Sequence, residues 1–183
     1  MLRDNGVLLL SDEVYEHIVF DGRAHQSLLR RPALAARSFV VSSFGKTYHC
    51  TGWKVGYCVA PPALTAEFRK VHQFVQFAVA APMRAALARF MVECPAHARE
   101  LGDFYQRKRD RFLALLAGTP LRPIPTAGTY FQLADYSALS RQHDVEFARA
   151  LTREIGVAAI PVSVFSTGGA PARLVRFCFA KND

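Results

Sequence analysis

The sequence lacks long apolar runs, and no stretch approaches the roughly 20 apolar residues that a helix needs to span a bilayer. Its N-terminal residues show neither a long apolar stretch nor a small-residue cleavage site. Cysteines are few, four in 183 residues, and no Cys-x-x-Cys pair occurs, which argues against a disulfide framework or a zinc knuckle. We therefore predict an intracellular, cytoplasmic protein with no membrane segment and no metal site.

Acidic residues are fewer than basic ones, 15 against 23, and the formal net charge is +8. The excess is spread along the chain, and the aromatic or groove-reading motifs of nucleic-acid-binding proteins are absent, so we expect no nucleic-acid partner. Charged residues make up 21% and hydrophobic residues 51% of the chain, which is enough apolar material for a core. The length suits one domain, or one small domain with part of another.

Three short apolar runs near the N-terminus, 7–10, 39–41 and 55–60, do not alternate with polar residues. This pattern is typical of strands buried on both faces of a parallel sheet. A helix is predicted between the first two, over 27–37, which gives the strand, crossover, strand order of an α/β protein. Residues 1–60 supply too few helices to cover both faces, so we predict that this sheet is the end of a larger one.

After Pro61 and Pro62 the periodicity becomes helical. Helices are predicted over 63–77, 82–93 and 96–116, and Gly118 follows as a stop signal. Strands are then expected at 128–133, 157–160 and 174–179, with a helix over 145–155 that Asp144 caps. These elements predict three parts: the end of a large domain (1–62), connecting helices (63–95) and a small α+β domain (96–183).

Two short polar segments follow apolar strands, where functional sites of α/β sheets lie. The first is Ser11-Asp12-Glu13-Val14-Tyr15, which places a carboxylate and a phenol three residues apart. The second is Ser42-Ser43-Phe44-Gly45-Lys46-Thr47-Tyr48, followed eight residues after Lys46 by a second cation, Lys54. An amine at the end of a buried strand can act as a nucleophile towards a carbonyl group.

Together these segments resemble the fold-type I aminotransferases of class I and II, which use pyridoxal 5'-phosphate. The resemblance is carried by Asp12-Glu13-Val14-Tyr15, by Ser43-Phe44-Gly45-Lys46-Thr47-Tyr48 with Gly52-Trp53-Lys54-Val55-Gly56-Tyr57, and by Arg176-Phe177-Cys178-Phe179-Ala180. It covers nearly the whole chain and implies the later part of the large domain, with a mainly parallel sheet, followed by the small α+β domain.

The resemblance implies a role for each matched residue. Lys46 would form the Schiff base with the cofactor and move a proton during catalysis. Asp12 would contact the pyridine nitrogen and Tyr15 the phenolic oxygen, while Ser43 and Lys54 would contact the phosphate. Many relatives have arginine at the position of Lys54, and lysine lacks the planar fork of that side chain. Arg176 would bind the substrate carboxylate through two hydrogen bonds.

The resemblance also implies a transaminase that exchanges an amino group between an amino acid and a 2-oxo acid, and a homodimer. Within the family, the segment 46–54 is most similar to the methionine, glutamine and kynurenine-type branch, so methionine or an aromatic amino acid is the expected donor. The family's phosphate loop would lie upstream of the first motif, so we expect a fragment that is inactive alone. The alternatives are a carbon–sulfur β-lyase and a non-catalytic truncated module.

Overall fold

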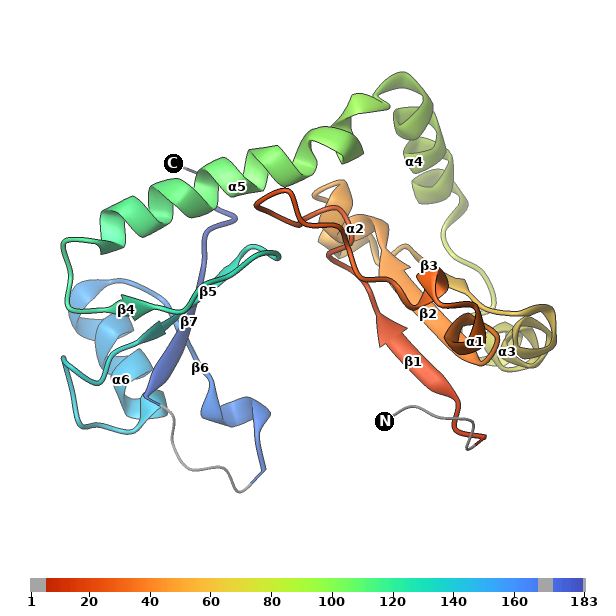
Figure 1. Cartoon of the computed structure of the whole chain (residues 1–183). Helices are drawn as coiled ribbons and strands as arrows, with labels where there is room; N and C mark the ends of the chain where they lie inside the picture. The colour runs from red at the N-terminus through yellow and green to blue at the C-terminus, as the bar shows by residue number, and fades with distance from the viewer. Residues whose placement is uncertain (1–5, 168–172, 183) are drawn as a thin grey trace. The chain divides into compact units, whose positions relative to one another are not determined.

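The computed structural model describes residues 6–167 and 173–182. The chain divides into two compact units, one ending at Gly102 and one beginning at Asp103, and each is described by itself. Helix α5 (Ala96–Leu116) begins in the first unit and ends in the second (Figure 1). The predicted domain boundaries at 62 and 95 stay a prediction.

The first unit contains a three-stranded sheet in the order β1 (Leu9–Asp12), β2 (Ser38–Ser43) and β3 (Gly56–Val59). Strands β1 and β2 are parallel, and Asp12 pairs with Val41, so the prediction of a parallel pair is confirmed. Strand β3 is antiparallel to β2, contrary to the prediction. The short helical connection after β2 returns the chain at the same end of the sheet, whereas a parallel partner needs a crossover to the other end.

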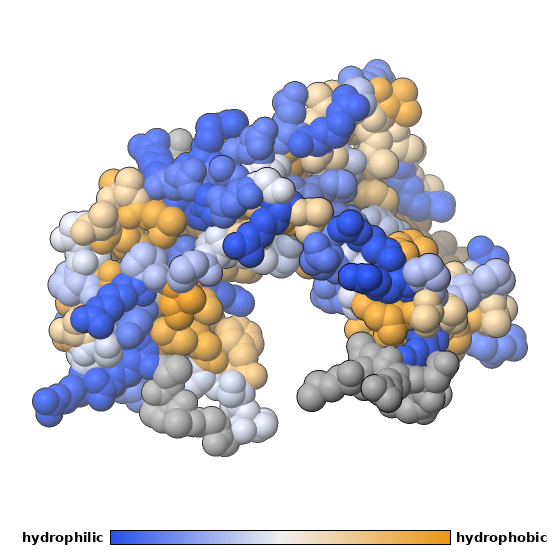
Figure 2. Space-filling model, in the orientation of Figure 1, coloured by the Kyte–Doolittle hydropathy of each residue, from blue (hydrophilic) through white to orange (hydrophobic). Residues whose placement is uncertain are grey.

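The burial pattern of the sheet also differs from the prediction of strands covered on both faces. Strand β2 alternates between buried and half-buried residues, whereas Leu8 and Leu10 are 55% and 74% exposed. Apolar side chains also reach the surface over the helix α4 (Figure 2). An apolar run in a sequence predicts that its side chains will be covered. Among the described residues no helix or strand covers these apolar side chains.

The helices of the first unit follow the predicted spans except at the first crossover. Instead of one helix over 27–37, the chain forms the 3-10 helix η1 (Leu28–Arg30) and the single-turn helix α1 (Pro32–Ala35). Pro32 is the reason, because a residue without an N–H can start a helix but interrupts one in progress. Further along are α2 (Phe44–Thr47), the 3-10 helix η2 (Thr51–Trp53), α3 (Pro62–Val75) and α4 (Ala81–Glu93).

The second unit packs helices against an antiparallel sheet whose order is β4-β5-β7-β6. Its strands are β4 (Arg122–Pro123), β5 (Phe131–Asp135), β6 (Ile160–Pro161) and β7 (Leu174–Cys178). Its helical elements after α5 are α6 (Asp144–Ala150), the π-helix η3 (Leu151–Ile155) and the 3-10 helix η4 (Ser163–Phe165).

The core of the second unit lies between the sheet and the helices, where Tyr136 stacks on Phe147 with ring centroids 4.0 Å apart. Helix α6 begins one residue earlier than predicted, and His143 is its N-cap in place of Asp144. The carboxylate of Asp144 binds Ser163 instead, so it is committed to a tertiary contact. In the described part of the chain no helix is long and apolar enough to cross a membrane.

Candidate active site

The turn that follows β1 carries the first predicted motif. Asp12 is the last residue of the strand and is exposed, and its Oδ1 accepts a hydrogen bond from the Val14 N–H at 3.1 Å. The Glu13 N–H donates to the Val41 carbonyl of β2 at 2.8 Å, which keeps the start of the turn attached to the sheet. Tyr15 follows within the turn and is half-buried.

Glu13 is buried and fixes this turn from one side. Its Oε1 accepts hydrogen bonds from the Leu28 N–H at 2.9 Å and from Ser11 Oγ at 3.0 Å, and its Oε2 lies 2.8 Å from His25 Nε2. Burial acts to raise the pKa of Glu13, but the hydrogen bonds from His25, Ser27, Leu28 and Ser11 outweigh burial, and the pKa is lowered. The side chain is therefore a carboxylate at neutral pH.

Glu16 attaches the other end of the turn to the sheet. Its Oε1 accepts hydrogen bonds from Ser42 Oγ at 2.8 Å and from the Tyr57 hydroxyl, and these two residues are cross-strand partners on β2 and β3. Burial and the adjacent Glu16 carboxylate raise the pKa of Tyr57 to about 12. The phenol therefore stays protonated and remains a donor at neutral pH.

Lys46 lies on the single-turn helix α2, directly after β2. The side chain of Ser43 caps this helix by accepting the Gly45 N–H at 3.1 Å. Gly45 is buried, and a Cβ at this position would lie 2.8 Å from the Cα of Thr51, so α2 packs closely on η2. At the other end of α2, His97 Nε2 lies 2.7 Å from the Thr47 carbonyl oxygen. The lysine is thus carried on a short but firmly packed segment, and it is half-buried.

Lys54 is exposed and has a left-handed backbone, with φ 53° and ψ 41°. This conformation is uncommon for a residue with a side chain, and such residues cluster at functional sites. Its ammonium group makes no hydrogen bond or ion pair with another residue in the ranges that the structure describes. The hydroxyl of Ser43 donates only a long contact of 3.5 Å to the Val55 carbonyl oxygen. A cation and a weakly engaged hydroxyl suit an anionic group.

The parallel pairing of β1 and β2 places their carboxyl ends at the same edge of the sheet. Asp12 and Ser43 end these two strands, and Tyr15 and Lys46 each lie three residues further on. A pocket of about 330 Å³ at this edge is lined by Glu16, His17, Ser43, Phe44, Thr47, Tyr48, Tyr57 and Met91. Lys46 and Asp12 are not among its lining residues.

Arg176 lies in the second unit, at the middle of β7 between Leu133 of β5 and Ile160 of β6. Its guanidinium carbon is 4.2 Å from the ring centroid of Phe131 and 4.9 Å from that of Phe165. Its Nε is buried and has no hydrogen-bond partner in the described part of the chain. A buried donor without a partner is costly, so this guanidinium is suited to an anionic ligand.

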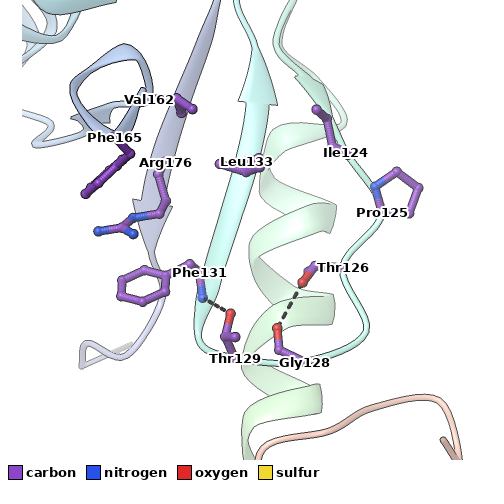
Figure 3. A pocket seen from close by; sticks show the side chains of 10 residues that line it. All are labelled: Ile124, Pro125, Thr126, Gly128, Thr129, Phe131, Leu133, Val162, Phe165 and Arg176. Carbon is purple, nitrogen blue, oxygen red and sulfur yellow. Dashed lines mark hydrogen bonds between the residues drawn. The ribbon is translucent and has the colours of Figure 1, made fainter. Parts of the chain in front are cut away.

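The pocket beside Arg176 has a volume of about 350 Å³ and is mainly apolar (Figure 3). Figure 3 shows the arginine side chain reaching from β7 between the two aromatic rings. The pocket is lined by Ile124, Pro125, Thr126, Gly128, Thr129, Phe131, Leu133, Val162, Phe165 and Arg176. Arg176 is the one charged residue in this lining of described residues.

Comparison with known proteins assigns this arrangement to a family. The family model described as aminotransferase class I and II matches residues 1–183. The chain belongs to the class I and II aminotransferases. This family is dependent on pyridoxal 5'-phosphate, and the resemblance inferred from the sequence motifs is confirmed.

Individual aminotransferases match over nearly the whole chain. A methionine aminotransferase of Escherichia coli (strain K12) is 52% identical over 177 residues, which is 97% of this chain and 46% of the relative. A kynurenine–oxoglutarate transaminase of Dictyostelium discoideum is 36% identical over 197 residues, with 96% and 45% covered. The chain thus spans about half the length of the curated relatives it matches.

Solved structures give the same assignment. The crystal structure of the Escherichia coli methionine aminotransferase YbdL matches with a TM-score of 0.93 and 53% identity, over 96% of this chain and 47% of that one. The N-succinyldiaminopimelate aminotransferase of Mycobacterium tuberculosis matches with a TM-score of 0.90 and 36% identity, over 97% and 46%. The predicted fold, the α/β end of a fold-type I aminotransferase with a small α+β part, is confirmed.

The donor set of this aminotransferase chain fits pyridoxal 5'-phosphate. Lys46 offers a primary amine, Asp12 an exposed carboxylate, and Ser43 and Lys54 a hydroxyl and a cation for a phosphate. In the described residues no group of three or more histidine, cysteine or acidic side chains is arranged to hold a metal ion. The chemistry of these side chains therefore matches the family's cofactor.

Sequence reasoning missed the residues that support the site. Glu13 and Glu16 fix the turn after β1, and Phe131 and Phe165 flank Arg176. In the sequence, Glu13 and Glu16 appear only as acidic residues shortly after an apolar strand, and this position does not reveal that they support the turn. Phe165 is 11 residues before Arg176, and no spacing rule links the two.

Proposed function

We propose that this chain supplies the lysine, the cofactor contacts and the substrate arginine of an enzyme that transfers an amino group between an amino acid and a 2-oxo acid. The observation that carries the proposal is the parallel register of β1 and β2. It puts Asp12 and the Lys46 helix at the same edge of the sheet, where α/β proteins bind ligands. Membership of an aminotransferase family supports the same reaction.

Five residues would hold the cofactor. Asp12 would keep the ring nitrogen protonated, and the Tyr15 hydroxyl would donate to the phenolic oxygen. Ser43 and Lys54 would bind the phosphate, and Lys46 would bind the aldehyde carbon. When bound, pyridoxal phosphate withdraws the electrons that remain after an α-proton is lost.

The chain's own groups then perform the proton transfer. The Lys46 amine would take the proton from the substrate α-carbon and return it at the neighbouring position, which is general base and general acid work. Arg176 would receive the substrate carboxylate through its guanidinium and so orient the α-carbon. The buried Nε without a partner and the two flanking rings support this role.

We propose methionine, or an aromatic amino acid, as the amino donor. The pocket beside Arg176 is lined by apolar groups, and Arg176 is its one charged lining residue in the described ranges. An apolar donor side chain therefore fits this pocket, whereas an acidic one would lack a second cation. The relatives described as methionine and kynurenine aminotransferases agree with this choice.

We further propose that the chain alone binds the cofactor weakly and does not turn over. It spans about half of its relatives, and the resemblance puts the phosphate-binding helix N-terminus outside it. A cytoplasmic homodimer completes the proposal. The four cysteines are all free, which suits a reducing compartment, and apolar side chains remain exposed for a second copy.

A chimera tests the proposed reaction. The upstream half of the Escherichia coli methionine aminotransferase is fused to this chain, and methionine is supplied with 2-oxoglutarate and pyridoxal phosphate. We expect the 2-oxo acid of methionine as product, and a loss of about 10²- to 10⁴-fold in Lys46→Ala. In a second assay the chimera is given a cysteine conjugate, and formation of pyruvate and ammonia would indicate a β-lyase instead. A folded chimera that holds the cofactor but does neither reaction would favour the non-catalytic module.

A further inference from the structure

Arg176 is held in place without an acidic partner in the described residues. Two aromatic rings flank its guanidinium, one on each of two different elements. Phe131 belongs to β5, whose hydrogen bonds to β7 fix it beside the arginine. Phe165 belongs to the three-residue helix η4 and is 63% exposed, so its position depends on what holds η4.

Asp144 is the residue that holds η4. It is the first residue of α6, it is 0% exposed, and both carboxylate oxygens bind the first residue of η4. The Ser163 N–H donates to Oδ2 at 2.7 Å, and Ser163 Oγ donates to Oδ1 at 2.6 Å. Phe165 follows two residues later, and Val162, another residue of the Arg176 pocket, comes directly before.

Contacts at the start of helix α6 account for only part of the binding of this carboxylate, since it accepts the Val145 N–H and its Oδ1 lies 3.0 Å from His143 Nδ1. His143 is the N-cap residue, and its Nδ1 accepts the Val145 N–H at 3.4 Å. Burial acts to raise the pKa of Asp144, but the hydrogen bonds from Ser163 and the nearby His143 outweigh burial and lower it. A fully buried carboxylate costs free energy unless its oxygens are bound, and here Ser163 binds both of them.

We propose that Asp144 is a positioning residue for the carboxylate site at Arg176. By binding Ser163 through both oxygens it fixes η4, so that Phe165 and Phe131 hold the guanidinium in one orientation before the substrate arrives. The gain is pre-organisation, because an arginine that is already ordered loses less side-chain entropy on binding. This inference rests on the proposed role of Arg176 and extends it to a residue that does not touch the substrate.

The first test reads the orientation of Arg176 without any ligand. In the ¹⁵N-labelled chain, the Nε–H signal of Arg176 is shifted by the ring currents of the two flanking rings, and Arg176→Lys identifies it. We expect Asp144→Asn and Ser163→Ala to move this signal towards that of an ordinary arginine while the other amide signals of β5 and β7 stay in place.

The matched control is Asp135→Asn, because Asp135 also accepts a backbone N–H, that of Ser137 at 2.7 Å, but is not bonded to η4. We expect no shift of the Arg176 signal in this variant. Ser163→Ala keeps the buried carboxylate and removes only the hydrogen bond from the Ser163 hydroxyl, so it serves if Asp144→Asn does not fold. An unchanged Arg176 signal in folded Ser163→Ala would overturn the proposal.

The second test measures binding of 4-methylthio-2-oxobutanoate to the same chains. We expect the Kd to rise about three- to tenfold in Asp144→Asn and Ser163→Ala through lost pre-organisation, and to stay unchanged in Asp135→Asn. If Arg176→Lys binds this probe as well as the parent chain does, the proposed carboxylate role of Arg176 fails. The ring-current shift then still decides whether Asp144 positions the arginine.

Discussion

Two buried carboxylates, Glu13 and Asp144, hold the loops that carry the proposed site residues. Each is bound by groups from another part of the chain, the first by His25 and Leu28 and the second by Ser163. Neither is required for the proposed chemistry itself. At this scale the site depends on carboxylates that fix the backbone as well as on the groups that would meet cofactor and substrate.

Glu13→Gln tests the first of these contacts. Because the pKa of Glu13 is lowered in the folded chain, its contribution to stability is fully present above the ordinary value of about 4.3. It is lost as the pH falls through the lower, folded pKa. We expect the variant to lose about 1–3 kcal/mol of unfolding free energy at pH 7, and less at acidic pH, as measured by urea denaturation across the pH range.

The control is Glu67→Gln, since Glu67 is exposed and forms an ion pair with Lys70 one helical turn away. We expect at most a few tenths of a kcal/mol from that surface pair. A cost for Glu13→Gln that stays the same from pH 7 down to pH 3 would show that the charge of Glu13 is not what stabilises the turn.

The site residues differ in how far the sequence reveals them. Asp12 and Lys46 stand out because polar groups follow apolar strands, and that position marks ligand sites in α/β folds. Glu16 does not stand out, because its partners, Ser42 and Tyr57, come together only when β2 and β3 pair. The left-handed backbone of Lys54 was also hidden, since Gly and Asn are the residues that signal it.

At the scale of elements, the close packing of α2 on η2 sets the position of the Lys46 backbone. Gly45→Ala would place a Cβ 2.8 Å from the Cα of Thr51, and a backbone atom cannot swing aside as a side chain can. We expect a loss of about 1–3 kcal/mol of unfolding free energy, as for other overpacked sites. Thermal or urea denaturation followed by circular dichroism measures it.

Gly52→Ala is the matched control, because Gly52 lies on η2 and a Cβ there meets no atom within 4 Å. We expect its unfolding free energy to stay within about 0.5 kcal/mol of the parent. Equal stability of the two variants would mean that α2 and η2 are not closely packed.

Elements with a strong periodic signal were predicted well, and elements governed by contacts were not. The apolar stripe over 96–116 corresponds to α5 residue for residue. The predicted parallel direction of β3 was wrong, because an apolar run does not indicate whether a strand pairs parallel or antiparallel. The predicted helix over 27–37 was wrong because Pro32 splits it, and the predicted strand over 157–160 is reduced to the short β6.

At the scale of the whole molecule, large apolar side chains remain uncovered on the first unit. Phe74 and Val75 at the end of α3 are 85% and 80% exposed, and Phe77 just after the helix is 83% exposed. We expect this surface to drive association of the chain. The double variant Phe74→Ser with Phe77→Ser reduces this exposed apolar surface, so sedimentation velocity at a fixed concentration should show a larger monomer fraction. The variant should stay folded, because these exposed side chains contribute little packing.

The comparison variant is Leu139→Ser, an exposed apolar residue of the second unit. We expect Leu139→Ser to leave the monomer fraction unchanged. This result would show that association depends on the apolar surface at α3 and not on the polarity of the chain in general. A parent chain that is already monomeric at every concentration, or a double variant that associates equally, would contradict the expectation.

The most direct test of the central claim, that Lys46 is the amine that meets the cofactor, is borohydride trapping. The purified chain is mixed with a range of pyridoxal phosphate concentrations, reduced, digested and mapped by mass spectrometry, with Lys46→Arg as the control. We predict that the pyridoxyl group is found on Lys46 before it is found on Lys70, Lys108 or Lys181, and that labelling is incomplete at low cofactor. Labelling of those other lysines while Lys46 stays unmodified would contradict the account.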